Sequence, residues 1–217
     1  MKKLLITILT ALSATTILAQ DNMSVPVSSD TARRVAPLEA DIRAEHMLFK
    51  GEQINGTLEY FSQKLERKGF SFLIPEPSGA TFYGKFAGYQ DCYVLVETNN
   101  NIVYRVSVAF PRRHVWDDVS ADFEYLKEML IKKYGTPADS LIDFRTHEPR
   151  DNYSKLMKVK NNLCDYYIKF EMPRGTITLS IGSMEPSPVR RYNPCVVLAY
   201  EDKLNAQKEV TKAYDDL

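Results

Sequence analysis

The sequence has few of the residues that mark specialised protein classes. Its 217 residues include one Trp, three Cys, three His, nine Gly and eleven Pro, which excludes collagen-like and low-complexity chains. It also has no excess charge, because 28 Lys and Arg balance 28 Asp and Glu. The chain therefore lacks the basic excess of a protein that holds nucleic acid by bulk charge. With 44% hydrophobic residues it is not intrinsically disordered either.

Long apolar runs are missing after the first residues of the chain. Residues 1–19 combine Lys2 and Lys3 with an uncharged apolar run and small residues up to Ala19, which is the order of a secretory signal peptide. The alternative is a buried N-terminal helix. No later stretch approaches the ~18 apolar residues of a membrane span. We therefore predict a soluble exported protein, periplasmic or secreted, with cleavage near Ala19 and a slightly acidic mature chain.

The three cysteines do not suggest a disulfide framework. Cys92, Cys164 and Cys195 are an odd number, so at least one has no internal partner. Cys164 and Cys195 open two predicted strands that would be separated by a third, which places them roughly 9–10 Å apart. A disulfide needs a Cα separation under ~7 Å. We expect three buried, reduced thiols.

Motifs of catalysis and cofactor binding are also missing. There is no His-x-x-x-His, no Cys-x-x-Cys, no acidic calcium loop, no Gly-x-Ser-x-Gly, no phosphate loop and no dinucleotide fingerprint. Asp117 and Asp118 suit the first turn of a helix, where acids are favourable. We therefore assign no catalytic residue, no metal and no cofactor. A hydrolase whose residues meet only in three dimensions stays open.

Two segments have the pattern of amphipathic helices. Residues 57–68 begin at the candidate N-cap Thr57 and stop before Gly69. Residues 116–134 carry a stronger apolar stripe, with Lys132 and Lys133 in the last turn and Gly135 after it. We expect Trp116, Phe123, Leu126 and Leu130 to be in the core.

Strand patterns follow each helix. They lie at 71–74, 81–86, 91–98 and 102–110 after the first helix, and at about 140–146, 155–161, 163–172, 175–182 and 195–201 after the second. The hairpins 92–108 and 164–181 are alike, and each is opened by a Cys. We favour an internal duplication over chance similarity. The predicted organisation is a signal peptide 1–19, a flexible lead-in 20–45, repeats 46–112 and 113–204, and a C-terminal helix 205–217.

The predicted fold is α+β: an antiparallel sheet from two helix-plus-meander repeats, with the helices packed on one face. Several segments also carry a family resemblance: Phe49–Gly51, Ile54–Thr57, Lys64–Phe70, Gly84–Tyr89, Lys132–Pro137 and Gly175–Ile181. With these the chain resembles a group of uncharacterised exported proteins of Bacteroides-type bacteria, which implies no catalytic residues. In architecture alone it is similar to the tandem-repeat fold of beta-lactamase-inhibitor proteins, and fold does not fix function.

Alternation along the strands predicts an outward-facing row of polar and aromatic residues. Its members are Tyr83, Lys85, Tyr93, Arg105, Tyr167 and Lys169. Tyrosine and arginine are enriched at binding surfaces, although tyrosine is also a good strand residue and lysine is ordinary at a surface. The leading hypothesis is a non-catalytic binding or inhibitor-like module for a protein or glycan of the cell envelope. A hydrolase and a structural assembly protein are the alternatives, and the oligomeric state stays open.

Overall fold

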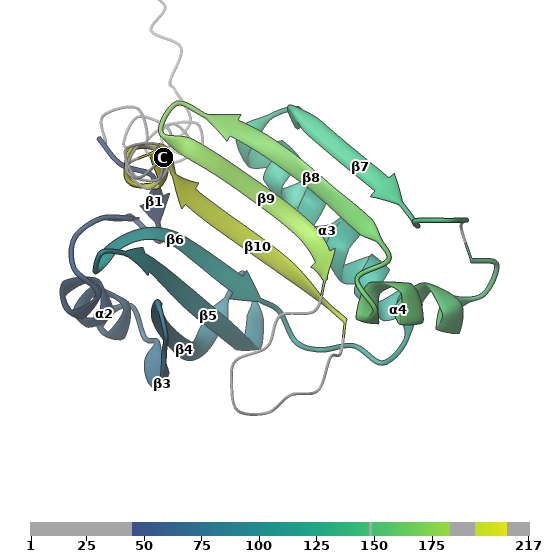
Figure 1. Cartoon of the computed structure of the whole chain (residues 1–217), viewed down its shortest axis with the longest axis horizontal. Helices are drawn as coiled ribbons and strands as arrows, with labels where there is room; N and C mark the ends of the chain where they lie inside the picture. Colours follow the sequence, from purple (N-terminus) through teal and green to yellow (C-terminus); the bar gives the residue numbers. More distant parts are fainter. Residues whose placement is uncertain (1–44, 148, 183–193, 208–217) are drawn as a thin grey trace, which may run out of the picture.

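The structure is a computed structural model that describes residues 45–147, 149–182 and 194–207. The predicted signal peptide, nearly all of the lead-in and most of the predicted C-terminal helix lie outside the described residues. The described chain is mixed α and β, with a large antiparallel sheet of eight strands and a small sheet of two (Figure 1). Within the described residues, no helix is long and apolar enough to cross a membrane.

The two predicted helices form, and their ends follow the expected chemistry. Helix α2 covers Leu58–Arg67, and the Thr57 side chain accepts a hydrogen bond from the Tyr60 backbone N–H. Helix α3 covers Trp116–Tyr134, with acids in its first turn and lysines in its last. Gly69 and Gly135 follow the two helices at φ +88° and +87°, a backbone conformation that glycine adopts without strain.

The strands of the large sheet come in two meanders. Before α3 lie β3 (Ser71–Glu76), β4 (Gly79–Phe86), β5 (Tyr89–Asn99) and β6 (Ile102–Ala109). After α3 lie β7 (Asp139–Asp143), β8 (Asp165–Met172), β9 (Gly175–Gly182) and β10 (Cys195–Asp202). The spatial order is β3-β4-β5-β6-β10-β9-β8-β7. The last strand of each meander therefore lies at the centre, and β3 and β7 form the edges.

One predicted strand is wrong. The predicted strand 155–161 instead forms most of helix α4 (Asn152–Lys160) and its C-cap Asn161, and the helix interrupts the second meander between β7 and β8. The Asp151 side chain accepts a hydrogen bond from the Ser154 backbone N–H at 2.8 Å and so caps the helix. The alternation of apolar residues with lysines also suits a strand. The cap formed by Asp151 is the local signal that favours a helix.

The two hairpins compared in the sequence occupy different places in the sheet. Strand β6 lies at the centre beside β10, whereas β9 is one strand further out. The element order instead relates β3–β6 to β7–β10, each set following a helix. The element order therefore aligns the hairpin β5–β6 with β9–β10, whereas the sequence comparison aligned it with β8–β9. Internal duplication stays a prediction.

The core lies between the sheet and α2 and α3. Strand residues of one parity are buried, among them Val94, Val106, Leu179 and Leu198. Trp116, Phe123, Leu126 and Leu130 of α3 are buried as predicted. The rings of Trp116 and Phe123 contact Tyr166 of β8 edge-on, with centroids 5.7 and 4.9 Å apart. Figure 1 shows α3 behind β8 and β9, running along the strands.

A second aromatic cluster fixes the N-terminal residues. Phe49 lies in β1 (Leu48–Phe49), which pairs with β2 (Glu52–Gln53). Its ring stacks on Phe86 at 5.5 Å and meets Tyr200 of β10 edge-on at 5.5 Å. Segments from both ends of the described chain therefore share one core.

Polar contacts fix two further junctions. Arg113 binds both carboxylate oxygens of Asp122 in α3, at 2.6 and 3.1 Å, and the Tyr89 hydroxyl donates to the same carboxylate at 2.9 Å. Asp202, with no exposed surface, accepts from the backbone N–H groups of Met47 and Asn205 at 2.7 and 2.8 Å. His46 Nδ1 lies 3.1 Å from Asp202 Oδ1. The Asp202 carboxylate thus joins the N-terminal segment to the end of β10.

The three cysteines are free, in agreement with the prediction of reduced thiols. Burial was predicted for all three; Cys92 and Cys195 are buried, but Cys164 is half-buried, so this part of the prediction is wrong for Cys164. Strand β9 separates β8 from β10, as the disulfide argument assumed.

Candidate functional site

The side of the sheet opposite the buried strand residues is called the outer face here. Figure 1 shows β8, β9 and β10 in front of α3, with no described helix across their near side. Residues paired across antiparallel strands point to the same side. The strand register therefore arranges the outer face in rows that run across the sheet.

Tyrosines lie at both ends of one such row. The tyrosine row comprises Tyr83, Tyr93, Ala109, Val197, Ser180, Tyr167 and Leu141, each opposite the next on neighbouring strands. The Tyr83 and Tyr93 rings meet edge-on, with centroids 5.6 Å apart. Four strand spacings separate Tyr93 from Tyr167, which corresponds to about 19 Å. The pair Tyr83 and Tyr93 on one side and Tyr167 on the other thus flank a centre of smaller side chains.

Carboxylates hold the outer tyrosines in place. The Tyr83 hydroxyl donates to Asp91, and the Tyr167 hydroxyl donates to Asp139 Oδ2 at 2.9 Å. These hydrogen bonds raise the pKa of both phenols, because a neighbouring carboxylate favours the protonated form. Both tyrosines therefore present a neutral ring.

The centre of the outer face is formed by small residues. Ser107, Ala109 and Ala199 are 3%, 3% and 6% exposed, although they point away from the helices. The middle of the outer face therefore carries small side chains.

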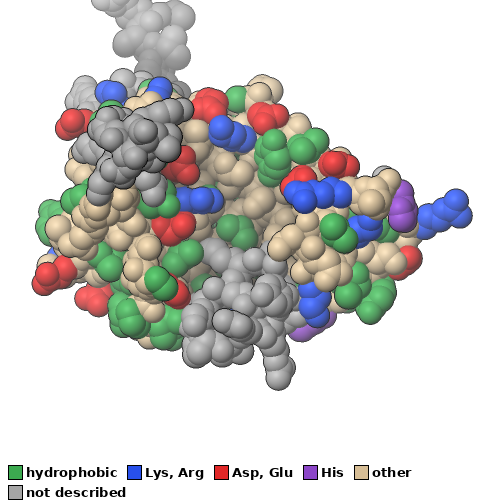
Figure 2. Space-filling model, in the orientation of Figure 1, with side chains coloured by type: hydrophobic (Ala, Val, Ile, Leu, Met, Phe, Trp, Pro, Cys, Tyr) green, Lys and Arg blue, Asp and Glu red, His purple; other side chains and the backbone are tan. Residues whose placement is uncertain are grey.

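A second row is acidic. The glutamate row comprises Glu76, Gly79, Glu97, Arg105, Glu201, Thr176 and Glu171, again in register from strand to strand. Arg105 Nε lies 3.4 Å from Glu97 Oε2. Lys169 belongs to the row between the tyrosine row and the glutamate row. Its Nζ lies 2.7 Å from Glu171 Oε1, and this contact raises the pKa of the lysine. Figure 2 shows red and blue side chains close together on this side of the molecule.

The structure brings most of the predicted site residues to one face. Tyr83, Tyr93, Arg105, Tyr167 and Lys169 lie on the outer face in the rows given above. Lys85 is exposed at a register shift between Gly84 and Phe86, and so lies outside these rows.

Sequence reasoning missed the carboxylates of this face. Glu97 and Glu171 follow Leu95 and Lys169 at a spacing of two residues, so the alternation that selected the tyrosines also selects them. Glu201 and Glu76 could be added only after the strand register was known.

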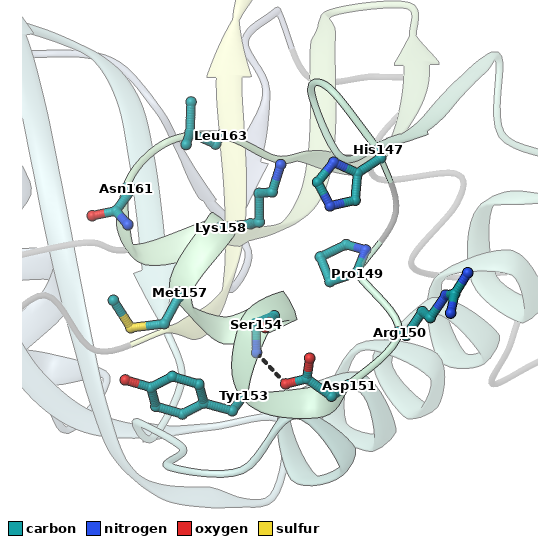
Figure 3. Close-up of a pocket in the computed structure, with 10 residues that line it drawn as sticks. All are labelled: His147, Pro149, Arg150, Asp151, Tyr153, Ser154, Met157, Lys158, Asn161 and Leu163. Atoms are coloured by element: carbon teal, nitrogen blue, oxygen red, sulfur yellow. Dashed lines mark hydrogen bonds between the residues drawn. The ribbon is translucent and has the colours of Figure 1, made fainter.

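A pocket of about 680 Å³ lies elsewhere, beside α4. Its lining includes Pro149, Tyr153, Met157, Lys158 and Leu163. Lys158 Nζ donates to the Arg145 carbonyl at 2.7 Å. Figure 3 shows the Asp151 carboxylate turned back toward Ser154, and this hydrogen bond lowers the pKa of the carboxyl.

Two charged groups of this pocket already have hydrogen-bond partners within the chain. Its Asp151 carboxylate caps the helix, and its Lys158 ammonium is bound to the backbone of the loop. Figure 3 shows Arg150 pointing away from the other lining residues. Among the described residues, no three His, Cys, Asp or Glu side chains lie close enough to hold a metal ion.

Comparisons with known proteins add no neighbour: no protein family, no curated protein and no solved structure matches this chain. The site is therefore interpreted from its own geometry.

Proposed function

We propose that the protein is an exported, non-catalytic binding module that holds a protein partner on the outer face. The observation that carries this proposal is the tyrosine row, in which pre-positioned rings flank a centre of small side chains. Tyrosine contributes large contact area at a small cost in conformational entropy. Hydrogen bonds to Asp91 and Asp139 reduce that cost further, because they hold two of the rings before a partner arrives.

Replacement of the tyrosines tests the proposal. The variant Y83A/Y93A/Y167A removes the three rings from the outer face, and Y60A/Y125A/Y153A removes three exposed rings from the helices as a matched control. Each purified chain is immobilised and incubated with an envelope extract. We expect the control to capture the same partner as the unmodified chain, and the outer-face variant to lose it. Equal capture by both variants would refute the proposal.

We further propose that the two halves arose by duplication and that the chain is related to the exported Bacteroides-type group. The order of elements supports the first point, because a helix and a four-strand meander occur twice and the final strands β6 and β10 meet at the centre. The same order supports the architectural similarity to beta-lactamase-inhibitor proteins. Superposition of residues 58–109 on 116–202 in an experimental structure tests the duplication.

A further inference from the structure

The outer face is acidic although the chain as a whole is neutral. The tyrosine row, the glutamate row and the row between them, which includes Asp139 and Lys169, contain five carboxylates and two cations: Glu76, Glu97, Glu171, Glu201 and Asp139, with Arg105 and Lys169. The chain has 28 basic and 28 acidic residues, so this excess of negative charge is local. A local charge excess on a proposed binding face constrains the charge of the partner.

Both cations of the face already have acidic neighbours. Arg105 lies between Glu97 and Glu201 in the register, with Glu97 3.4 Å away. Lys169 is held by Glu171 at 2.7 Å and also lies near Glu201 and Asp139, which act on its pKa in the same direction. An anionic ligand would have to compete with these carboxylates for either cation.

The partly buried position of the central charges strengthens their effect. The side chains of Arg105 and Glu97 are 39% and 28% exposed, so their fields are less screened by water than those of fully exposed groups. Glu201 is likewise half-buried, in the central strand β10. Glu201 thus lies at the centre of the glutamate row, next to Arg105 in the register.

The spacing of the rows fits a polypeptide better than a point charge. Four residues along β5 separate Glu97 from Tyr93, so the glutamate row and the tyrosine row are about 13 Å apart. Ser107 and Ala199 lie between them. A Lys or Arg side chain could place its charge on the glutamate row, while apolar parts of the same segment contact the tyrosines.

We propose that the outer face binds a protein segment bearing lysine or arginine side chains, whose cations dock on the glutamate row beside Glu201. This inference rests on the proposed function, since it names the partner class of the same face. The sequence places Arg105 and Lys169 in the predicted binding row, and this inference assigns the choice of partner to the carboxylates beside them.

Binding of a labelled lysine–serine peptide tests the charge of the face, with a glutamate–serine peptide as the counterpart. We expect the unmodified chain to bind the lysine peptide at low ionic strength, with affinity that falls as salt is added. The variant E97Q/E201Q should weaken this binding about tenfold, because it removes two carboxylates and leaves Arg105 uncompensated. The variant E59Q/E66Q makes the same change of charge on exposed positions of α2 and should bind like the unmodified chain.

The variant R105Q gives a test of opposite sign. Removing the central cation should tighten binding of the lysine peptide about threefold or more, whereas a face that recognises anions predicts no gain. The inference is overturned if the glutamate peptide binds better, if binding ignores salt, as for a neutral glycan, or if E59Q/E66Q weakens binding as much as E97Q/E201Q. Unchanged urea midpoints confirm that each variant is folded.

Failure of this inference is distinguishable from failure of the proposed function. If Y83A/Y93A/Y167A loses the natural partner while E97Q/E201Q retains it, the face binds but the glutamate row does not select the partner. If the tyrosine variant retains the partner, both proposals fail.

Discussion

Removal of the Asp202 carboxylate should be among the most destabilising changes in this protein. Asp202 has no exposed surface and accepts hydrogen bonds from two backbone N–H groups, those of Met47 at 2.7 Å and Asn205 at 2.8 Å. In Asp202→Ala both donors lose their acceptor at a fully buried position. His46, 7% exposed, loses its partner as well.

The expected loss follows from these contacts. A buried donor left without an acceptor costs about 1–3 kcal/mol. Two backbone donors and the partner of His46 together suggest about 3–5 kcal/mol, with the lower value applying if water enters the space. A domain typically has 5–15 kcal/mol of stability, so this is a large fraction of the total. In thermal unfolding the same change corresponds to roughly 6–20 °C.

Urea unfolding of the purified chain measures this loss. Trp116 is the single tryptophan and lies in the core, so its fluorescence reports on global unfolding. Asp143→Ala removes an exposed carboxylate from β7 and should change stability by less than about 0.5 kcal/mol. Asp202→Asn, which keeps one acceptor oxygen, should fall between the two.

Two outcomes would refute the reasoning. A loss below about 1 kcal/mol for Asp202→Ala would mean that the buried donors find other partners at little cost. An equal loss for Asp143→Ala would mean that the effect arises from net charge. A lower dependence of the unfolding free energy on urea would instead show that the N-terminal segment detaches before the sheet unfolds.

Two further predictions concern Asp122 and the thiols. Asp122→Ala leaves the Tyr89 hydroxyl and the Arg113 guanidinium without their shared acceptor, and should lower the free energy of unfolding by about 1–3 kcal/mol, measured in urea. Burial raises the pKa of Cys92 and Cys164 from 9.0 to about 11, so about one thiol in a thousand is ionised at pH 8 and iodoacetamide should label the native chain far more slowly than the unfolded one. Because the thiols of the unfolded chain ionise first, the free energy of unfolding should also fall as pH rises from 9.0 toward about 11. Rapid labelling of the native chain, or a free energy of unfolding that is constant over this pH range, would contradict the raised pKa of the thiols.

Local signals were sufficient for α2 and α3. Thr57, Gly69 and Gly135 act on backbone groups within a few residues, and such signals are readable along the chain. For α4 the same kind of signal, the cap formed by Asp151, was present and outweighed the alternation that suggested a strand. In this segment the capping residue indicates the structure better than the short apolar alternation does.

The outer face was predictable only in part. Strand alternation placed Tyr93 and Tyr167 on the same side as Arg105 and Lys169, because side chains alternate along each strand. It could not place Glu201 beside Arg105, because that pairing depends on β10 inserting next to β6, 96 residues later in the chain. The charge of the face depends on that insertion.

By itself the sequence determined the elements that form within short stretches: two capped helices, the hairpin strands, and the parity that separates core from surface. Periodicity, capping and turn chemistry are local, so they can be read from the sequence without knowledge of the fold. Only the tertiary structure decided which strands are neighbours, which carboxylates surround Arg105, and how Asp202 joins the two ends of the described chain. Those are contacts between distant residues, set by packing the whole core at once.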